Sequence, residues 1–344
     1  MPAPLTSILR SVNRDRNRPL NILFSNNHEA YSATLAKTGH TFYMLRHPRF
    51  HSWSTQERPL PDNVVVLSGE DVVRQLKTDL SIDLVLTQNR IDHHPIMIQL
   101  AQQLNCPMLQ AEHSLPWYEW DDETIEKVGL LPCSHNVFMT DFSVDAWFMD
   151  RDDPNISVIR HGMDTDYWNG WVGSDGKVMT SVWNYPQRNR ICGFDLYQEV
   201  TKGLATNPWG DSPGFSKNAD NVDHLRELYR HASVFLNTTL WSTTPFGLLE
   251  AMSVGCPIVT TATTAMPEFI VDGVNGFITN DPVTIKRRLL ELIDNPELGK
   301  KIGEAGRQTV IEQFGQQRFL DEWNEVLWRV ASCPPGRLEL GDRR

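Results

Sequence analysis

Residues 233–261 encode a strand, a helix and a second strand, and no other segment constrains the fold of this chain so strongly. Val234-Phe-Leu-Asn-Thr-Thr239 is short and rich in β-branched and apolar residues, a compact helical pattern follows, and Pro257-Ile-Val-Thr-Thr261 is a second apolar run. Two strands joined by one helix in so short a span pair in parallel with a right-handed crossover. The segment therefore predicts an open α/β sheet, which binds ligands beside the carboxyl ends of its strands.

The helix in this segment has readable ends. We expect Thr244 to cap it, because a threonine hydroxyl can accept from an early backbone N–H, and Pro245 to occupy its first position. Gly255 is expected to end it. Its predicted buried stripe consists of Leu248, Leu249 and Met252.

The start of the same helix predicts an anion site. Backbone N–H groups around Phe246, Gly247 and Leu248 have no helical acceptor, and the positive end of the helix dipole lies behind them. Such an end binds a diphosphate readily. Glu250, in the first turns of the helix, can accept hydrogen bonds from sugar hydroxyls.

The stretch from Pro245 to Thr261, continued by residues 266–277, resembles the donor-site signature of retaining glycosyltransferases of the GT-B fold, family 4. That signature contains two glutamates eight positions apart, the first associated with the transferred sugar and the second with the nucleotide ribose. The resemblance implies that Glu250 holds the ribose. Ser242 stands at the place of the first glutamate, so the sugar contact passes to Ser242, Thr243 or Thr244, or is lost.

The resemblance also implies the domain organisation. A GT-B chain has two Rossmann-like doubly wound domains that face a cleft, and a terminal helix that crosses back to the first domain. We expect an acceptor-side domain over residues 1–162, a nucleotide-sugar domain over 163–320, and the terminal helix with a tail over 321–344. Residues 158–168 are similar to the interdomain hinge of the family, with His161 in place of an asparagine. Because Asp164 and Asp166 lie within this hinge, they are expected to form a turn and cap and not a metal site.

The basic residues that clamp the donor diphosphate depart from the family pattern. Gly193-Phe-Asp-Leu196 matches the start of the family's helix, but Cys192 occupies the usual lysine position and Asn184 roughly the usual arginine position. Arg188 and Arg190 lie on the loop between them, and a guanidinium can bind phosphate in bidentate fashion. We therefore assign the clamp to these two arginines; the alternative is a solvated loop.

Strands alternate with helical runs in the first 160 residues, which predicts a doubly wound parallel sheet. The predicted strands cover residues 21–25, 41–45, 64–67, 84–86, 108–110, 135–140 and 156–159, and the predicted helices cover 28–37, 70–80, 95–104 and 144–149. The family's glycine-rich loop after the first strand is replaced here by Ser25-Asn-Asn-His-Glu29. Asn26, Asn27 and His28 offer side-chain donors there, so they are acceptor-side candidates.

A second group of candidates follows the strand at 108–110. His113 lies just beyond the carboxyl end of that strand, where several family 4 enzymes carry a histidine that touches the donor sugar; a structural histidine is the alternative. Trp117 and Tyr118, with Trp120, can stack on a sugar ring, or they can pack under a loop. His93 and His94 have no further ligands nearby in sequence, so no metal and no cofactor are expected.

Composition excludes some classes of function. The formal charge of −11 and the pI near 5.5 argue against a broad nucleic-acid-binding surface. The five cysteines are scattered without a C-x-x-C pair, and no signal peptide or apolar run of membrane-spanning length is found, so a cytoplasmic protein with reduced thiols is expected. Residues 1–19 are basic with interleaved apolar residues, which predicts a solvated arm or a weak contact at the inner membrane face.

These observations predict a retaining, metal-independent glycosyltransferase. It would move a hexose from a nucleotide-diphosphate sugar, UDP-linked in preference to GDP-linked, to a hydroxyl on an unidentified glycan, lipid-linked or small-molecule acceptor. Two alternatives remain open: a GT-B nucleotide-sugar epimerase or hydrolase, and a binding module that keeps the nucleotide pocket but has lost transfer.

Overall fold

The computed structural model describes residues 18–68 and 80–333, and the chain forms two compact units within it. The first unit contains residues up to Arg160 and those from Gln317 onward, and the second contains His161–Gln316. The domain boundaries expected from the sequence, after residues 162 and 320, lie two and four residues later than these. The predicted helix at 70–80, most of the N-terminal arm and the C-terminal tail lie outside the described residues.

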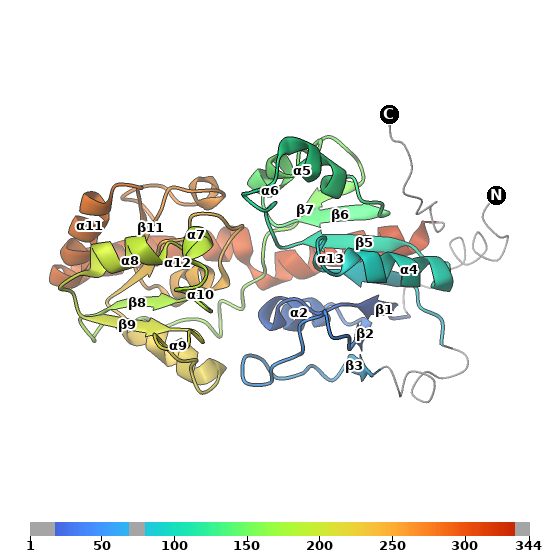
Figure 1. Cartoon of the computed structure of the whole chain (residues 1–344). Helices are drawn as coiled ribbons and strands as arrows, with labels where there is room; N and C mark the ends of the chain where they lie inside the picture. Colours follow the sequence, from blue (N-terminus) through green and yellow to red (C-terminus); the bar gives the residue numbers. More distant parts are fainter. Residues whose placement is uncertain (1–17, 69–79, 334–344) are drawn as a thin grey trace. The chain divides into compact units, whose positions relative to one another are not determined.

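The first unit is built on a seven-stranded sheet in which every neighbouring pair is parallel, in the order β3-β2-β1-β4-β5-β6-β7 (Figure 1). Its strands are β1 Asn21–Phe24, β2 Thr41–Leu45, β3 Val64–Leu67, β4 Leu84–Thr87, β5 Met108–Glu112, β6 His135–Phe138 and β7 Ile156–Val158. Its helices are α2 Glu29–Ala36, α4 His94–Leu104, α5 Asp122–Gly129, α6 Asp141–Ala146 and α13 Gln316–Ser332, the last of which begins one residue before the unit boundary.

The second unit has a five-stranded parallel sheet in the order β12-β11-β10-β8-β9 (Figure 1). Its strands are β8 Val178–Ser181, β9 Thr206–Trp209, β10 Val234–Asn237, β11 Ile258–Thr260 and β12 Phe277–Ile278. Its helices are α7 Asn189–Cys192, α8 Phe194–Thr201, α9 Val222–His231, α10 Phe246–Val254, the 3-10 turn η1 Met266–Glu268, α11 Pro282–Asp294 and α12 Pro296–Phe314.

Two parallel α/β sheets were predicted, and the prediction is confirmed. One predicted helix is shifted along the chain, and two elements were missed. The helix expected over 144–149 is α6, three residues earlier, because the Thr140 side chain caps it by accepting from Ser143 N across 3.1 Å. Helix α5 and strand β9 were not predicted: α5 is half polar, and β9 contains Pro208, which the pattern disfavours in a strand.

Helix α10 is more buried than an amphipathic helix. The predicted stripe residues Leu248, Leu249 and Met252 are buried, but so are all the other residues from Leu248 to Val254. The helix packs against α9 and α12 as well as the sheet, so every side of it is covered. Gly255 ends it with φ 91°, a left-handed conformation that glycine adopts without strain, as predicted.

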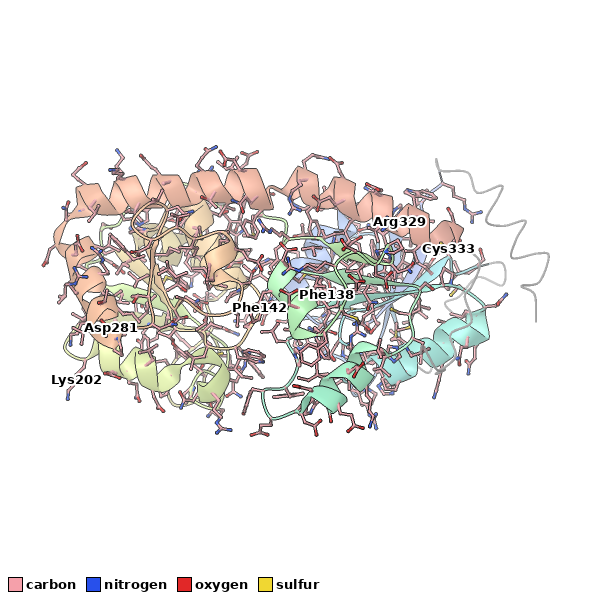
Figure 2. The ribbon with its side chains drawn as sticks, turned by 90° about the horizontal axis from the view of Figure 1, so that it is seen from above. Phe138, Phe142, Lys202, Asp281, Arg329 and Cys333 are labelled. Carbon is pink, nitrogen blue, oxygen red and sulfur yellow. The ribbon has the colours of Figure 1, made fainter. Side chains whose placement is uncertain are left out.

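Hydrophobic clusters support each sheet. In the first unit, Phe138 of β6 (labelled in Figure 2) lies in one hydrophobic cluster with Val144 and Trp147, and all three side chains are buried. In the second unit, β8, β10 and β11 contribute to one core that α8 and α11 cover. These rigid layers hold the loops at the carboxyl ends of the strands, where the candidate site residues lie.

Candidate functional site

The order of the strands identifies where a ligand would bind in the second unit. Strand β9 is added on one side of β8, whereas β10, β11 and β12 are added on the other, so the order of the strands reverses between β8 and β10. Open α/β sheets bind ligands at such a switch point, beside the carboxyl ends of the two strands. The loops that follow β8 and β10 carry Asn184, Arg188 and residues 242–245, all of which were predicted for the donor site.

The start of α10 differs in one detail from the prediction. Pro245, in extended conformation with ψ 131°, is the N-cap residue, and no side chain caps the helix. The expected cap by Thr244 is therefore wrong: its Oγ1 is buried and has no hydrogen-bond partner within the described residues. Leu249 N donates to Pro245 O at 3.3 Å, so the N–H groups of residues 246–248 precede the first helical hydrogen bond. These are the N–H groups that the sequence predicts to bind an anion.

Glu250 is buried behind this helix end. Its Oε2 accepts a hydrogen bond from the hydroxyl of Tyr229 on α9 at 3.1 Å. A Cβ atom added at Gly247 would lie 3.1 Å from the same hydroxyl and 3.3 Å from Ser181 O at the end of β8. Glycine is thus needed at 247 for the close approach of α10 to α9 and β8, and Tyr229 fixes the carboxylate. Sequence reasoning did not assign Tyr229 a role, because a tyrosine on an amphipathic helix gives no signal beyond packing.

The segment that carries the two arginines is attached to the loop after β10. Ile191 O accepts from Leu240 N at 2.8 Å and from Trp241 N at 3.0 Å. Arg190, the neighbour of Ile191 on α7, is exposed. Arg188 is the N-cap residue of α7, and its guanidinium lies 5.9 Å from the ring of Trp183. The hydrogen bonds place α7 directly beside the loop that leads into α10.

The position of the missing lysine is filled by close packing. Cys192 is buried, its carbonyl accepts from Thr238 Oγ1 at 2.8 Å, and burial raises the pKa of its thiol. A neutral thiol there supplies no positive charge. Gly193 follows with φ 71°, and a Cβ atom on it would overlap the carbonyl oxygen of Thr238. This glycine therefore brings α8 against the end of β10.

Other predicted donor-site residues are held mainly by the backbone. Asn184 has the left-handed φ of 52°; its N–H donates to Asp211 O at 2.8 Å and its carbonyl accepts from Arg188 N at 3.0 Å. Thr243 is buried, and Ser242 is half-buried. His161, for which the sequence showed only a substitution, lies at this end of α10: its Nε2 is 3.2 Å from Thr244 O, and its ring is 4.4 Å from that of Phe246.

The acceptor-side candidates lie at the switch point of the first unit. The order of its strands reverses between β1 and β4, and the loop after β1 carries residues 26–28. Asn26 is buried: its Oδ1 accepts from Ser32 Oγ at 2.8 Å, while its Nδ2 has no acceptor among the residues that the structure describes. Asn27 is half-buried. Burial lowers the pKa of His28, the N-cap residue of α2, to about 4.

Two contacts at this switch point were not predicted. His93 Nδ1 lies 2.9 Å from Ser25 Oγ and so joins the loop after β4 to that after β1. Glu29 is buried, and its Oε1 accepts from Ser54 N at 2.8 Å and lies 3.0 Å from His51 Nε2. Hydrogen bonding to Glu29 raises the pKa of His51. Only the structure shows these contacts, since residues 51–54 belong to a long loop without periodicity.

His113 is half-buried and meets the ring of Tyr31 edge-on, with 4.3 Å between the centroids. Tyr31 in turn contacts Phe319 and Trp323 of α13. Trp117, on the same loop as His113, is 46% exposed and Tyr118 is 41% exposed. The alternative that these two rings pack under a loop is therefore wrong, although Trp120 does pack against Trp147.

Several features carry no predicted chemistry. Within residues 18–68 and 80–333 no group of His, Cys, Asp and Glu side chains is arranged to hold a metal ion. His94 faces Pro132 O, at 2.9 Å from Nε2, and Asp164 accepts from Tyr167 N at 3.1 Å in the predicted turn. All five cysteines are free. No helix in the described part of the chain has the length and apolar character needed to cross a bilayer.

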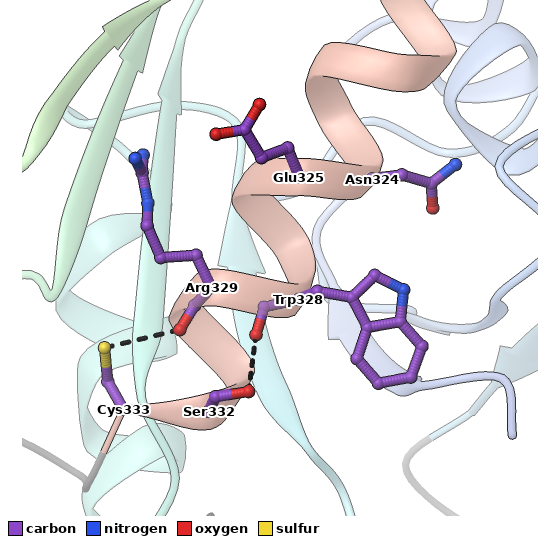
Figure 3. A pocket seen from close by; sticks show the side chains of 6 residues that line it. All are labelled: Asn324, Glu325, Trp328, Arg329, Ser332 and Cys333. Carbon is purple, nitrogen blue, oxygen red and sulfur yellow. Dashed lines mark hydrogen bonds between the residues drawn. The ribbon is translucent and has the colours of Figure 1, made fainter. Parts of the chain in front are cut away.

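A surface pocket lies along the last turns of α13 and Cys333, the residue after its end; Arg329 and Cys333 are labelled in Figure 2. It is lined by Asn324, Glu325, Trp328, Arg329, Ser332 and Cys333 (Figure 3). None of these residues was predicted for donor or acceptor binding. Two of the polar groups are used within the helix, since Ser332 Oγ donates to Trp328 O and Cys333 Sγ to Arg329 O.

Comparisons with known proteins agree with the geometry. Residues 204–295 match the family model described as glycosyl transferases group 1. The chain is 26% identical over 110 residues to the N-acetyl-alpha-D-glucosaminyl L-malate synthase of Bacillus anthracis, covering 31% of this chain and 29% of that protein. It is 28% identical over 118 residues to the alpha-maltose-1-phosphate synthase of Mycolicibacterium smegmatis, covering 31% and 30%. The match thus spans less than a third of either curated relative.

The similarity of the fold extends much further. Anabaena HepE in complex with UDP-glucose superposes with a TM-score of 0.70 at 12% identity, covering 90% of this chain and 99% of that chain. Sucrose-phosphate synthase from Thermosynechococcus elongatus superposes with a TM-score of 0.67 at 13% identity, covering 91% and 99%. The fold is therefore that of the GT-B glycosyltransferases, and the predicted resemblance to the group 1 glycosyltransferases is confirmed.

Proposed function

We propose that this chain is a retaining glycosyltransferase of family 4, which transfers a hexose from a UDP-sugar to an acceptor hydroxyl without a metal ion. One observation carries the proposal: the free N-terminus of α10, the buried Glu250 and the arginine-bearing segment meet at the switch point of the second sheet. The UDP-glucose bound to HepE favours a UDP-sugar over a GDP-sugar as the donor.

The site has the charges that departure of a nucleotide diphosphate requires. As the bond to the sugar breaks, negative charge develops on the β-phosphate, and fixed donors aimed at that charge stabilise the transition state. The N–H groups of residues 246–248 and the dipole of α10 supply part of this stabilisation. Arg188 and Arg190 supply the rest, in place of the lysine that Cys192 replaces. Glu250 accepts hydrogen bonds from the ribose.

The transferred sugar is held by residues other than a first glutamate. Ser242, Thr243 and Thr244 take over its contact, and the buried Thr244 Oγ1 without a partner supports this assignment. His113 orients the sugar and does not act as a nucleophile. In a retaining transfer the acceptor hydroxyl attacks the face from which the diphosphate leaves, and the leaving phosphate helps to deprotonate it.

The acceptor is a glycan, a lipid-linked glycan or a small molecule that binds the first unit. Asn26, Asn27 and His28 donate to it, and Trp117 with Tyr118 stacks on it. The exposure of these two aromatic rings supports a stacking role, because large apolar side chains gain by being covered. The reaction takes place in the cytoplasm, with peripheral contact at the inner membrane face.

Incubation with a panel of UDP- and GDP-sugars tests the proposal. Nucleotide release that depends on an added acceptor supports transfer. A new sugar isomer, or release that needs no acceptor, indicates the epimerase or hydrolase instead. Tight UDP-sugar binding without turnover indicates a binding module, which the loss of the first glutamate and of the lysine favours as the second candidate.

A further inference from the structure

One buried carboxylate binds the loops that follow two neighbouring strands of the first unit. Glu112, the last residue of β5, is fully buried. Its Oε1 accepts from Ser114 N at 2.9 Å, and its Oε2 accepts from Arg90 N at 3.1 Å. Ser114 belongs to the loop after β5 and Arg90 to the loop after β4. The carboxylate therefore fixes the distance between the two loop backbones.

The guanidinium of Arg90 extends this connection to other elements. It is fully buried, its Nε lies 3.5 Å from Glu112 Oε2, and its Nη1 donates to Gly129 O at 2.5 Å at the end of α5. Its Nη2 donates to Asn136 of β6. The guanidinium also lies 5.4 Å from the ring of Trp147, whose Nε1 donates to Ser114 O at 3.0 Å. Both the N–H and the C=O of Ser114 are thus held.

The surroundings of Glu112 require an acceptor. Two backbone N–H groups and Gln110 Nε2, at 3.3 Å, donate hydrogen bonds to its carboxyl, and Arg90 Nε forms an ion pair with it at 3.5 Å without a hydrogen bond. Burial raises the pKa of Glu112 to about 7, although Arg90 and the backbone N–H groups oppose this. Well-packed apolar residues often replace a buried ion pair without loss of stability. Stability alone therefore does not account for this network, and its particular consequence is geometric.

His113 lies in the chain between Glu112 and Ser114, the two residues that the contacts with Arg90 and Trp147 hold in place. We propose that Glu112, oriented by Arg90, is a positioning residue for His113, and that it sets the orientation of the imidazole. The ring of Tyr31 contacts the same imidazole edge-on, with 4.3 Å between the centroids. The proposal rests on the role given to His113 in the proposed function. A displacement of about 1 Å of a reacting or orienting group can reduce a rate by roughly 100-fold.

Two variants and one control test the inference. Glu112→Gln places an amide N–H₂ against donors, and Arg90→Met with Glu112→Leu replaces the whole pair by apolar side chains. His135→Gln is the control, because His135 is also buried in the first sheet but bonds Ser157 and Arg329 and not the His113 loop. The measurements are kcat and KM for UDP release from UDP-glucose in the presence of the added acceptor, the Kd for UDP, and the urea midpoint of unfolding.

We expect both Glu112 variants to lose at least about tenfold in kcat, with the KM for UDP-glucose and the Kd for UDP within about twofold of wild type. The double variant should show this loss while its urea midpoint stays near that of wild type. His135→Gln should unfold at lower urea and keep its kcat. Wild-type kcat in the double variant, or an equal loss of kcat in His135→Gln, would overturn the inference.

A second measurement separates this inference from the proposed function. If the wild-type chain neither binds UDP nor releases it from UDP-glucose, the proposed function fails. The positioning of His113 is then still measured by NMR, from the Cε1–H chemical shift of its ring. A shift that moves in Glu112→Gln but not in His135→Gln supports the positioning role, and one that is unchanged in Glu112→Gln contradicts it.

Discussion

The hydroxyl of Tyr229 donates a hydrogen bond to Oε2 of Glu250 across 3.1 Å, and both side chains are buried. The bond joins α9 to α10 directly behind the predicted diphosphate site. Because the carboxylate is desolvated and held by a neighbouring helix, its direction is fixed before any ligand binds. If Glu250 binds the ribose, the affinity for the nucleotide depends on Tyr229.

Tyr229→Phe should weaken UDP binding by about tenfold, because a hydrogen bond to a charged group contributes roughly 1.5–3 kcal/mol and part of it is recovered by water. Isothermal titration with UDP measures the change. Tyr197→Phe is the matched control: Tyr197 is also buried in the second unit, but it packs against Phe194 and Phe215. Equal affinities for UDP in the two variants would contradict the role of Tyr229.

Gly247→Ala should lower the free energy of unfolding by about 1–3 kcal/mol and weaken UDP binding, because its Cβ atom would crowd the Tyr229 hydroxyl at 3.1 Å and Ser181 O at 3.3 Å. Urea unfolding gives the stability change. In a Tyr229→Phe background the same substitution should cost less, since one of the two crowded atoms is gone. Fully additive costs would show that the hydroxyl does not limit the size of residue 247.

The double variant Arg188→Gln, Arg190→Gln should bind UDP about 10- to 100-fold more weakly, because each substitution removes a charge-assisted contact with the diphosphate. Uridine carries no phosphate, so the double variant should bind uridine with the same affinity as the wild type does. Arg287→Gln, which removes an exposed arginine from α11, serves as the control. If the double variant binds UDP as tightly as Arg287→Gln does, the two arginines do not bind the diphosphate, and the segment is a solvated loop.

Acid should destabilise the first unit, because its four buried histidines outweigh the opposite contribution of Glu112, whose raised pKa adds stability as the pH falls. Burial lowers the pKa of four of its histidines from 6.5 to about 4, namely His28, His93, His94 and His135. In the unfolded chain these rings bind protons as the pH falls below about 6.5, whereas the folded rings stay neutral until about pH 4. The stability they contribute is therefore complete above pH 6.5 and is lost between pH 6.5 and 4.

Urea midpoints measured at pH 7.5, 6 and 5 check this window. Each fully desolvated ring changes the free energy of unfolding by at most roughly 1.4 kcal/mol per pH unit. His135→Gln removes one of the four rings, so its stability should fall less steeply with pH than that of the wild type. A midpoint that stays constant from pH 7.5 to 5 would show that these rings are not desolvated in the folded chain.

The sequence predicted the sheets well because their signals are local. Short apolar and β-branched runs, such as Val64–Leu67, indicate strands, and Gly255 before Pro257 indicates the end of a helix. Helix α10 was found from the same kind of signal. The predicted N-cap was wrong. A threonine before a proline suggests that Thr244 caps the helix, whereas Pro245 itself adopts the extended conformation of an N-cap residue.

The partners of the site residues were not predictable. Tyr229 and Glu250 are 21 positions apart, and Arg90 and Glu112 are 22 apart, so no local pattern joins them. His161 and Thr244 are 83 positions apart. Each pair is set by the order of the strands in a sheet, and that order follows from packing of whole layers. The attachment of α7 to the loop after β10 is of the same kind, since two backbone N–H groups make it and any residues could supply them.

The central claim is that the N-terminus of α10 binds the diphosphate of a UDP-sugar while Glu250 binds its ribose. A crystal structure of the chain with UDP-glucose tests this most directly. The account predicts phosphate oxygens within hydrogen-bond distance of the backbone N–H groups of residues 246–248, with the ribose hydroxyls on Glu250. A diphosphate bound elsewhere, with Glu250 still bonded only within the protein, would contradict it.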